Sequence, residues 1–127
     1  MNFFGIGTDI VSIQRINKSL KNKNFLKRVF NEKEILKCKK INSSSNCYAK
    51  RFAAKEAFLK ALGIGLSKGI NFKEILVTNT KLGKPNIKLQ GTTQEIVRKI
   101  LKNKKINIFL TLSDDKPFAL ATVVISI

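Results

Sequence analysis

Residues 3–11 read FFGIGTDIV, an apolar run rich in β-branched residues that predicts a strand. Asp9 is the one charge in this run, and a buried carboxylate costs several kcal/mol unless it is paired or binds a metal. Side chains alternate along a strand, so Gly5 and Gly7 put bare backbone on the face of Asp9 and leave room for another group to approach. Two alternatives therefore stand for Asp9: a paired or metal-binding carboxylate, or a cap for the helix that follows.

Outward from this strand, helical and strand-like patterns alternate without a linker, repeat or low-complexity block. Ser12 can cap the first helix. The mixed order predicts one α+β domain spanning residues 1–127. Helices are expected over 13–22, 25–30, 32–40 and 45–62, and a further helix is expected from a capping box of Thr92 and Glu95 to about Lys104. Strands are expected over 72–80, 86–90, 106–112 and 118–127.

Charge and length limit the possible functions. The chain has 127 residues, with 25 Lys and Arg against 8 Asp and Glu, and this excess implies an anionic partner. There is no His, which excludes Ser-His and Cys-His pairs and a His-ligated zinc site. No apolar run approaches the ~20 residues of a membrane span, so no membrane association is expected. Cys38 and Cys47 form no CxxC motif, and we expect reduced thiols in a cytoplasmic protein.

Glu56 lies in AKRFAAKEAFLKALG (49–63), where helical spacing places it on a mostly apolar face. Lys60, four residues on, could simply pair with it. Arg51 and Lys55 lie on a neighbouring face, and a carboxylate flanked by three cations suits a phosphate with a divalent ion such as magnesium. The remaining acids are expected in ordinary helix-start, strand-surface or turn positions: Glu32, Glu34, Glu74, Glu95, Asp114 and Asp115.

Four segments match a known family in order and spacing: GIGTDIVSIQRI (5–16), RFAAKEAFLKALGIG (51–65), NTKLGKP (79–85) and LSDDKPFALATVVI (112–125). They resemble the holo-[acyl-carrier-protein] synthases, the short type of 4′-phosphopantetheinyl transferase. The resemblance implies an α+β fold with an antiparallel-rich sheet, and a homotrimer with active sites between subunits. It also implies transfer of 4′-phosphopantetheine from coenzyme A to a serine of apo acyl carrier protein, releasing adenosine 3′,5′-bisphosphate.

The resemblance further implies roles for individual residues. Asp9 and Glu56 would bind magnesium and, with Lys55, carry the chemistry; without a His, the base would be a carboxylate or a metal-bound water. The family commonly has Ser-His where this chain has Ser113-Asp114, so Asp114 either faces the nucleotide or, as we expect, caps the DDKP turn. The implied coenzyme A contacts are Arg51, Lys55, Lys60, Gly83, Lys84, Pro85, Thr111 and Ser113.

A basic helix face would steer and orient an acidic acyl carrier protein. The expected contacts are Arg15, Lys18, Lys21, Lys27 and Arg28. Two alternatives remain open on the sequence. A small nucleic-acid-binding module has the charge but lacks a recognition motif or a series of stacking aromatics, so no nucleic acid is expected. An inactive relative of the synthases is the other alternative, raised by Asp114.

Overall fold

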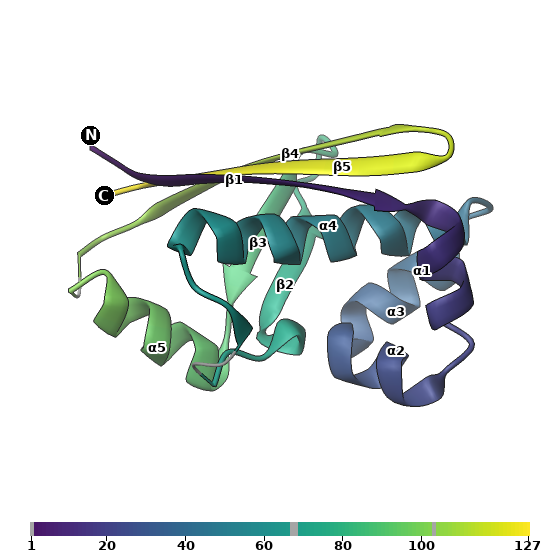
Figure 1. The fold of residues 1–127 in the computed structure, drawn as a ribbon, viewed down its shortest axis with the longest axis horizontal. Helices are drawn as coiled ribbons and strands as arrows, with labels where there is room; N and C mark the ends of the chain where they lie inside the picture. The colour runs from purple at the N-terminus through teal and green to yellow at the C-terminus, as the bar shows by residue number, and fades with distance from the viewer. Residues whose placement is uncertain (1, 67–68, 103) are drawn as a thin grey trace.

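The computed structural model describes residues 2–66, 69–102 and 104–127. A sheet lies along one long helix, with three short helices at one end of this helix and one at the other (Figure 1). Within these residues, no helix is both long and apolar enough to cross a membrane. In chain order the elements are β1 (Phe3–Ser12), α1 (Ile13–Ser19), α2 (Lys23–Val29), α3 (Glu32–Lys39), α4 (Ser44–Leu62), the 3₁₀ helix η2 (Phe72–Glu74), β2 (Ile75–Asn79), β3 (Pro85–Leu89), α5 (Gly91–Ile100), β4 (Asn107–Asp115) and β5 (Phe118–Ser126).

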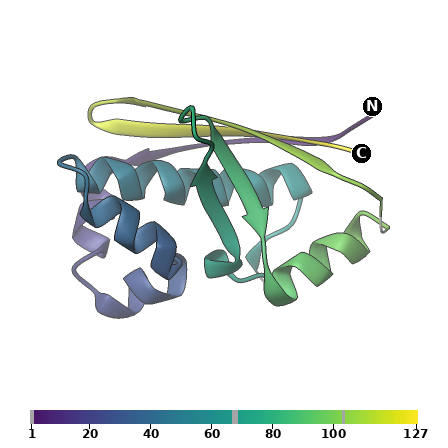
Figure 2. The same cartoon turned by 180° about the vertical axis from the view of Figure 1, so that it is seen from behind.

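Two antiparallel sheets pack around α4. The larger has the strand order β1-β5-β4, and the smaller is the β2–β3 hairpin. Figure 2 shows the hairpin on the side of α4 away from β1, where it runs up beside β4. The core lies between α4 and these sheets, and α4 supplies much of it, including Ala49, Phe58 and Leu62. The expected α+β class with an antiparallel-rich sheet is confirmed.

β1 lies directly on α4 because two glycines leave no side chains between them. A Cβ at Gly5 would collide with the backbone carbonyl oxygen of Ala61, and a Cβ at Gly7 with that of Ala57. Ala57 is fully buried and Ala61 nearly so. The group that approaches the bare backbone of β1 is therefore the long helix itself. Asp9, the next residue on that face of the strand, is carried to the side of α4.

The cap predicted from the sequence is present at the N-terminus of α1 but not at that of α5. The Ser12 hydroxyl accepts a hydrogen bond from a backbone N–H of the first turn of α1, as expected. The predicted capping box of Thr92 and Glu95 is wrong, because α5 starts at Gly91 and another acid occupies its N-terminus. The Glu74 carboxylate accepts from the backbone N–H groups of Thr92 and Thr93 at 3.2 and 3.1 Å.

The expectation of two free thiols is also wrong, because Cys38 and Cys47 form a disulfide. Cys38 lies in the last turn of α3 and Cys47 in the first turn of α4, and the short connection folds the two helix ends together. Their Cα atoms are 5.5 Å apart, within the range that a disulfide spans. Sequence separation alone does not reveal this approach.

The β1–α4 contact gives the first prediction. Gly7→Ala should lower the free energy of unfolding by about 1–3 kcal/mol, because its methyl group would push β1 away from the Ala57 carbonyl. Gly65→Ala is the matched control, since nothing lies within 4 Å of a Cβ there. Urea unfolding at one protein concentration measures both. Equal stability of the two variants would show that the strand and helix do not need this approach.

Candidate active site

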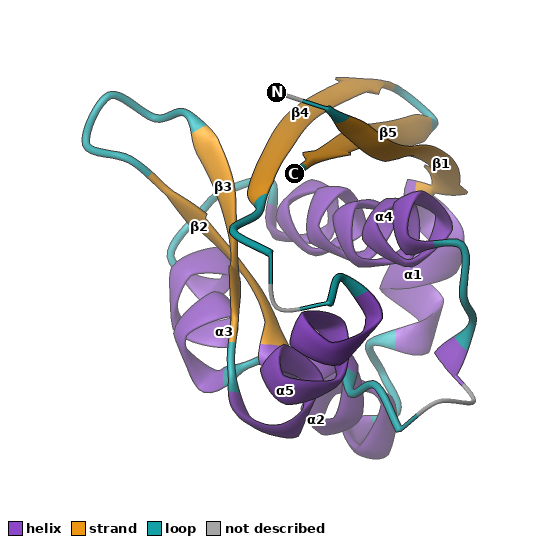
Figure 3. Cartoon of the chain, turned by 90° about the vertical axis from the view of Figure 1, so that its left-hand side faces the viewer, coloured by secondary structure: helices purple, strands orange, loops and turns teal. Residues whose placement is uncertain are grey.

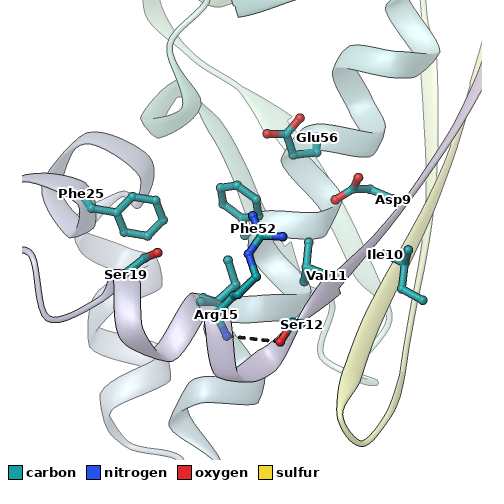
Figure 4. Close-up of a pocket in the computed structure, with 10 residues that line it drawn as sticks. Asp9, Ile10, Val11, Ser12, Arg15, Ser19, Phe25, Phe52 and Glu56 are labelled. Atoms are coloured by element: carbon teal, nitrogen blue, oxygen red, sulfur yellow. Dashed lines mark hydrogen bonds between the residues drawn. The ribbon is translucent and has the colours of Figure 1, made fainter.

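A cavity of about 460 Å³ opens where the end of β1 meets α1 and the middle of α4. Asp9 from β1 and Glu56 from α4 both line it, and Figure 4 shows their carboxylates on the same side of the cavity. Arg15 of α1 also lines it, and Phe25 and Phe52 form an apolar part of the wall. The fold thus brings together the two acids that interrupt apolar patterns in the sequence.

The pair of carboxylates retains one oxygen that no neighbouring donor satisfies among the residues that the structure describes. Oδ2 of Asp9 is buried and has no hydrogen-bond partner among the residues described. Burial, together with the charge of Asp9, raises the pKa of Glu56, while Lys60 opposes the increase. An orphaned carboxylate oxygen beside a second carboxylate fits a cation. In the described part of the chain no cluster of three acidic, His or Cys side chains exists, so a magnesium ion would have two protein carboxylates and take its other ligands from substrate and water.

Lys60 reaches the site from the next turn of α4, and its partner is Asp9 rather than Glu56. Its ammonium donates to Oδ1 of Asp9 at 3.1 Å and to the backbone carbonyl of Thr8 at 3.0 Å. About half of the side chain is exposed. The close approach of β1 explains this pairing, because it places the end of the strand within reach of a lysine on the helix.

Lys55 does not face the cavity, which contradicts its expected contact with coenzyme A and the reacting groups. Its ammonium is fully buried and donates to Glu34 Oε1 at 2.7 Å and to the carbonyls of Phe72 and Ile75 at 2.8 Å each. Burial lowers the pKa of Lys55, and the Glu34 carboxylate opposes the decrease. An ammonium has three donors, and all three are used inside the core.

Glu34 is the acid whose importance the sequence does not show. It completes a capping box with Asn31, as an ordinary helix-start acid does. Unlike such an acid, it is buried, pairs with Lys55, and accepts from the backbone N–H of Val77 at 3.1 Å. Its capping-box spacing is visible in the sequence, whereas its buried partners come from elements far along the chain.

Arg51 is also turned away from Asp9 and Glu56, toward the β2–β3 hairpin. Nη1 donates to the Cys47 carbonyl at 3.3 Å and Nη2 to Oδ1 of Asn79 at 3.1 Å. The Asn79 side chain donates in turn to the carbonyl of Gly83 at 3.1 Å. Arg51 and Asn79 therefore hold the turn that carries Lys84. Asn79 stands inside the NTKLGKP segment, but the sequence does not single it out.

The other expected coenzyme A contacts lie apart from Asp9 and Glu56 within one chain. Gly83, Lys84 and Pro85 belong to the hairpin, whose tip lies on the opposite side of β4 from β1 (Figure 3). Thr111 and Ser113 are exposed on the face of the sheet that points away from α4. None of these five residues lines the cavity of Asp9 and Glu56.

Asp114 takes neither of the two positions expected for it. Its carboxylate accepts a hydrogen bond from the Asn46 side chain at 2.8 Å and pairs with Lys50 at 3.4 Å, both on α4. The hydrogen bond from Asn46 is the main cause that lowers the pKa of Asp114. Residues alternate along β4, so Asp114 shares the helix-facing side with Leu112 and meets α4 instead of capping the turn.

The expected carrier-protein contacts lie on α1, on α2 and between them, and Arg15 alone of these lines the cavity. Arg15 faces it, and Lys18 and Lys21 are exposed at the end of α1 and just after it. Lys27 and Arg28 are exposed on α2. Arg28 also lines an apolar groove of about 530 Å³ that shares Phe25 and Phe52 with the cavity.

Comparison with known proteins agrees with this arrangement. The model of the 4′-phosphopantetheinyl transferase superfamily matches residues 5–123. The holo-[acyl-carrier-protein] synthase of Pelagibacter ubique is 50% identical over 125 residues, covering 98% of each chain. The chain belongs to the holo-[acyl-carrier-protein] synthases. The family and the transferase activity expected from the sequence are confirmed, and they displace the nucleic-acid-binding alternative.

Solved structures of this family share the fold. The crystal structure of the Neisseria meningitidis holo-[acyl-carrier-protein] synthase has 35% identity and a TM-score of 0.85, covering 98% of this chain and 99% of that one. The Helicobacter pylori holo-[acyl-carrier-protein] synthase, solved in complex with coenzyme A, has 35% identity and a TM-score of 0.79, covering 95% and 99%. The β1–α4 arrangement thus belongs to a synthase fold that one relative shows with coenzyme A bound.

The two lysines of α4 should respond differently to substitution. Lys55→Met should lower the free energy of unfolding by about 3–5 kcal/mol, because it leaves Glu34 charged and unpaired in the core. Lys60→Met should change it by less than about 1 kcal/mol, since the Lys60–Asp9 pair is partly exposed, yet lower turnover at least about tenfold. Unfolding and transfer assays on both variants test this. A Lys55→Met variant that folds stably but has lost transfer activity would show that Lys55 takes part in the reaction.

Proposed function

We propose that this synthase transfers 4′-phosphopantetheine from coenzyme A to a serine of apo acyl carrier protein with Asp9 and Glu56 holding a magnesium ion at the reacting pyrophosphate. The observation that carries the proposal is the cavity into which β1 and α4 bring these two carboxylates. The unpartnered Asp9 oxygen and the raised pKa of Glu56 support a cation there. Coenzyme A bound to the Helicobacter pylori relative supports the donor substrate.

The reaction is a displacement at phosphorus, which depends mainly on positioning and on charge stabilisation. The serine oxygen forms the new bond to phosphorus, and the bond to the bridging pyrophosphate oxygen breaks. When bound, magnesium would supply positive charge to the pyrophosphate oxygens. Lys60, held against the Thr8 carbonyl and the Asp9 carboxylate, donates to the departing phosphate. The serine proton passes to Glu56, directly or through a water that Glu56 or Asp9 orients.

The acidic acyl carrier protein docks on the exposed cations of α1 and α2. Rim charges of this kind speed association and set orientation. Arg15 has a second role, because it lines the cavity itself and can contact the pyrophosphate as well as the carrier protein. That the reaction takes place in the cytoplasm stays a prediction.

We further propose that the active unit is a homotrimer in which the β2–β3 hairpin of one copy completes the cavity of a neighbour. The expected coenzyme A contacts are separated within one chain, so a second copy is needed to bring them together. The outer face of the β1-β5-β4 sheet provides a surface for assembly. It exposes Ile6 by 69%, together with Ile10, Phe109 and Phe118, and exposed apolar side chains gathered on one face suit an interface.

Mass spectrometry of apo carrier protein incubated with coenzyme A, magnesium and this synthase tests the activity. The carrier should gain the mass of phosphopantetheine; no gain would support the inactive-relative alternative. Asp9→Asn and Glu56→Gln should each lower turnover at least about 100-fold and weaken magnesium binding measured by calorimetry with coenzyme A present. Glu95→Gln, on the surface of α5, is the control. Near-normal turnover of either site variant at limiting magnesium would show that the substituted residue is not a magnesium ligand.

Assembly is tested by placing a charge on the outer face of the sheet. Ile6→Asp should convert the trimer to monomers in sedimentation, because it buries a carboxylate in the proposed interface, and turnover should fall with it. Leu36→Asp, at an apolar position on α3 that is 60% exposed, should leave the trimer intact. A folded Ile6→Asp monomer with full activity would contradict a site shared between copies.

A further inference from the structure

The Cys38–Cys47 disulfide borders a second cavity, of about 200 Å³, between the end of α3, the start of α4 and β2. This cavity contains none of the residues that line the cavity of Asp9 and Glu56. Three cations line it: Lys37, Lys50 and Arg51. A small anionic molecule fits such a wall better than a neutral one.

The two sulfurs of the pair differ in access. Cys38 is 0% exposed and does not line the cavity, whereas Cys47 is 4% exposed and does. A molecule that enters the cavity therefore meets Cys47 first. Thiol–disulfide exchange requires direct attack on a sulfur atom, so access decides which cysteine reacts.

The surroundings of Cys47 also favour reaction at its sulfur. Nη1 of Arg51 donates to Sγ of Cys47 at 3.2 Å, and Cys47 lies in the first turn of the 19-residue helix α4. A neighbouring guanidinium and a helix N-terminus both stabilise a thiolate, which is the reactive form of cysteine. Arg51 is nine-tenths buried or more, so its position beside the sulfur is held by the fold.

We propose that Cys38 and Cys47 are a reversible redox pair, with Cys47 the thiol that exchanges with small anionic disulfides. In the reduced protein the Cys47 thiolate attacks a disulfide RSSR, forms a mixed disulfide and releases one RS⁻. The Cys38 thiol then loses its proton and attacks the Cys47 sulfur, releasing the second thiol. In total, two protein thiols and RSSR give the protein disulfide and two RSH. This chemistry does not depend on the transferase activity, so each proposal can fail without the other.

Redox titration of the full chain tests the pair. The protein is equilibrated in buffers of reduced and oxidised glutathione, and free thiols are then trapped with N-ethylmaleimide and counted by mass spectrometry. We expect a reversible change from two trapped thiols to none. Protein that keeps both thiols in excess oxidised glutathione, or that is not reduced again by excess glutathione, would overturn the proposal.

Single variants test which sulfur reacts. Cys38→Ser, which leaves Cys47, should form the mixed disulfide with glutathione at least about tenfold faster than Cys47→Ser, which leaves the fully buried Cys38. Equal rates would overturn the assignment of Cys47. The wild-type titration remains informative if either variant folds poorly.

Charge variants in the Cys38→Ser background test the preference for anions. Lys37→Gln should slow reaction with oxidised glutathione about threefold or more but leave reaction with the neutral 2-hydroxyethyl disulfide unchanged. Lys33→Gln, one turn earlier on α3 and outside the cavity, is the matched control. Equal slowing with both disulfides, or no slowing at all, would overturn the anion preference.

Discussion

The backbone of β1 rests on the backbone of α4, and the candidate active site depends on this contact. Gly5 and Gly7 face Ala61 and Ala57, so no side chain separates the strand from the helix. Protein interiors are close-packed, and even one added methyl group cannot be absorbed where backbone meets backbone. The consequence lies two residues further along the strand. Asp9 comes close enough to α4 to pair with Lys60 and to share a cavity with Glu56.

The rotation of α4 about its own axis then decides what each of its polar residues does. Successive residues turn by about 100°, so Glu56 points away from Lys55, whereas Arg51, one turn before Lys55, lies on nearly the same face as Lys55. Glu56 faces the cavity, Lys55 the core, and Arg51 the hairpin. The Lys55–Glu34 pair holds this rotation, because a buried charge must keep its partner. An ion pair that lies outside the cavity thus helps to orient Glu56 toward it.

Local pattern was sufficient to predict most of the elements and the two carboxylates. Asp9 and Glu56 stand out because an acid in an apolar stripe is costly, and that cost is a property of the segment itself. Lys55, Arg51 and Asp114 could not be placed in this way. Helical and strand periods show which residues share a face, but not whether that face meets solvent, core or another element. For Lys55 the answer comes from η2 and β2, which follow it in the chain.

Capping and cysteine pairing show the same difference: a contact within one helix can be predicted from the local sequence, whereas a contact between distant segments cannot. The Ser12 cap needs only residues of its own helix, and it forms as predicted. The N-terminus of α5 is instead capped by Glu74, which precedes a whole hairpin and accepts from the backbone N–H groups of Thr92 and Thr93. The disulfide likewise depends on how α3 folds back on α4, which spacing does not encode.

A continuous set of contacts links the disulfide to the hairpin that the proposed trimer presents to a neighbouring copy. Arg51 donates both to the Cys47 sulfur and to Asn79, and Asn79 donates to the Gly83 carbonyl in the turn. One guanidinium therefore divides its donors between the Cys47 sulfur and the Asn79 side chain that holds the turn. A thiolate at Cys47 is a stronger acceptor than a disulfide sulfur, so reduction would strengthen the contact between Arg51 and Cys47. In the proposed trimer, Arg51 and Asn79 would therefore connect the Cys47 sulfur of one copy to the turn that faces the next.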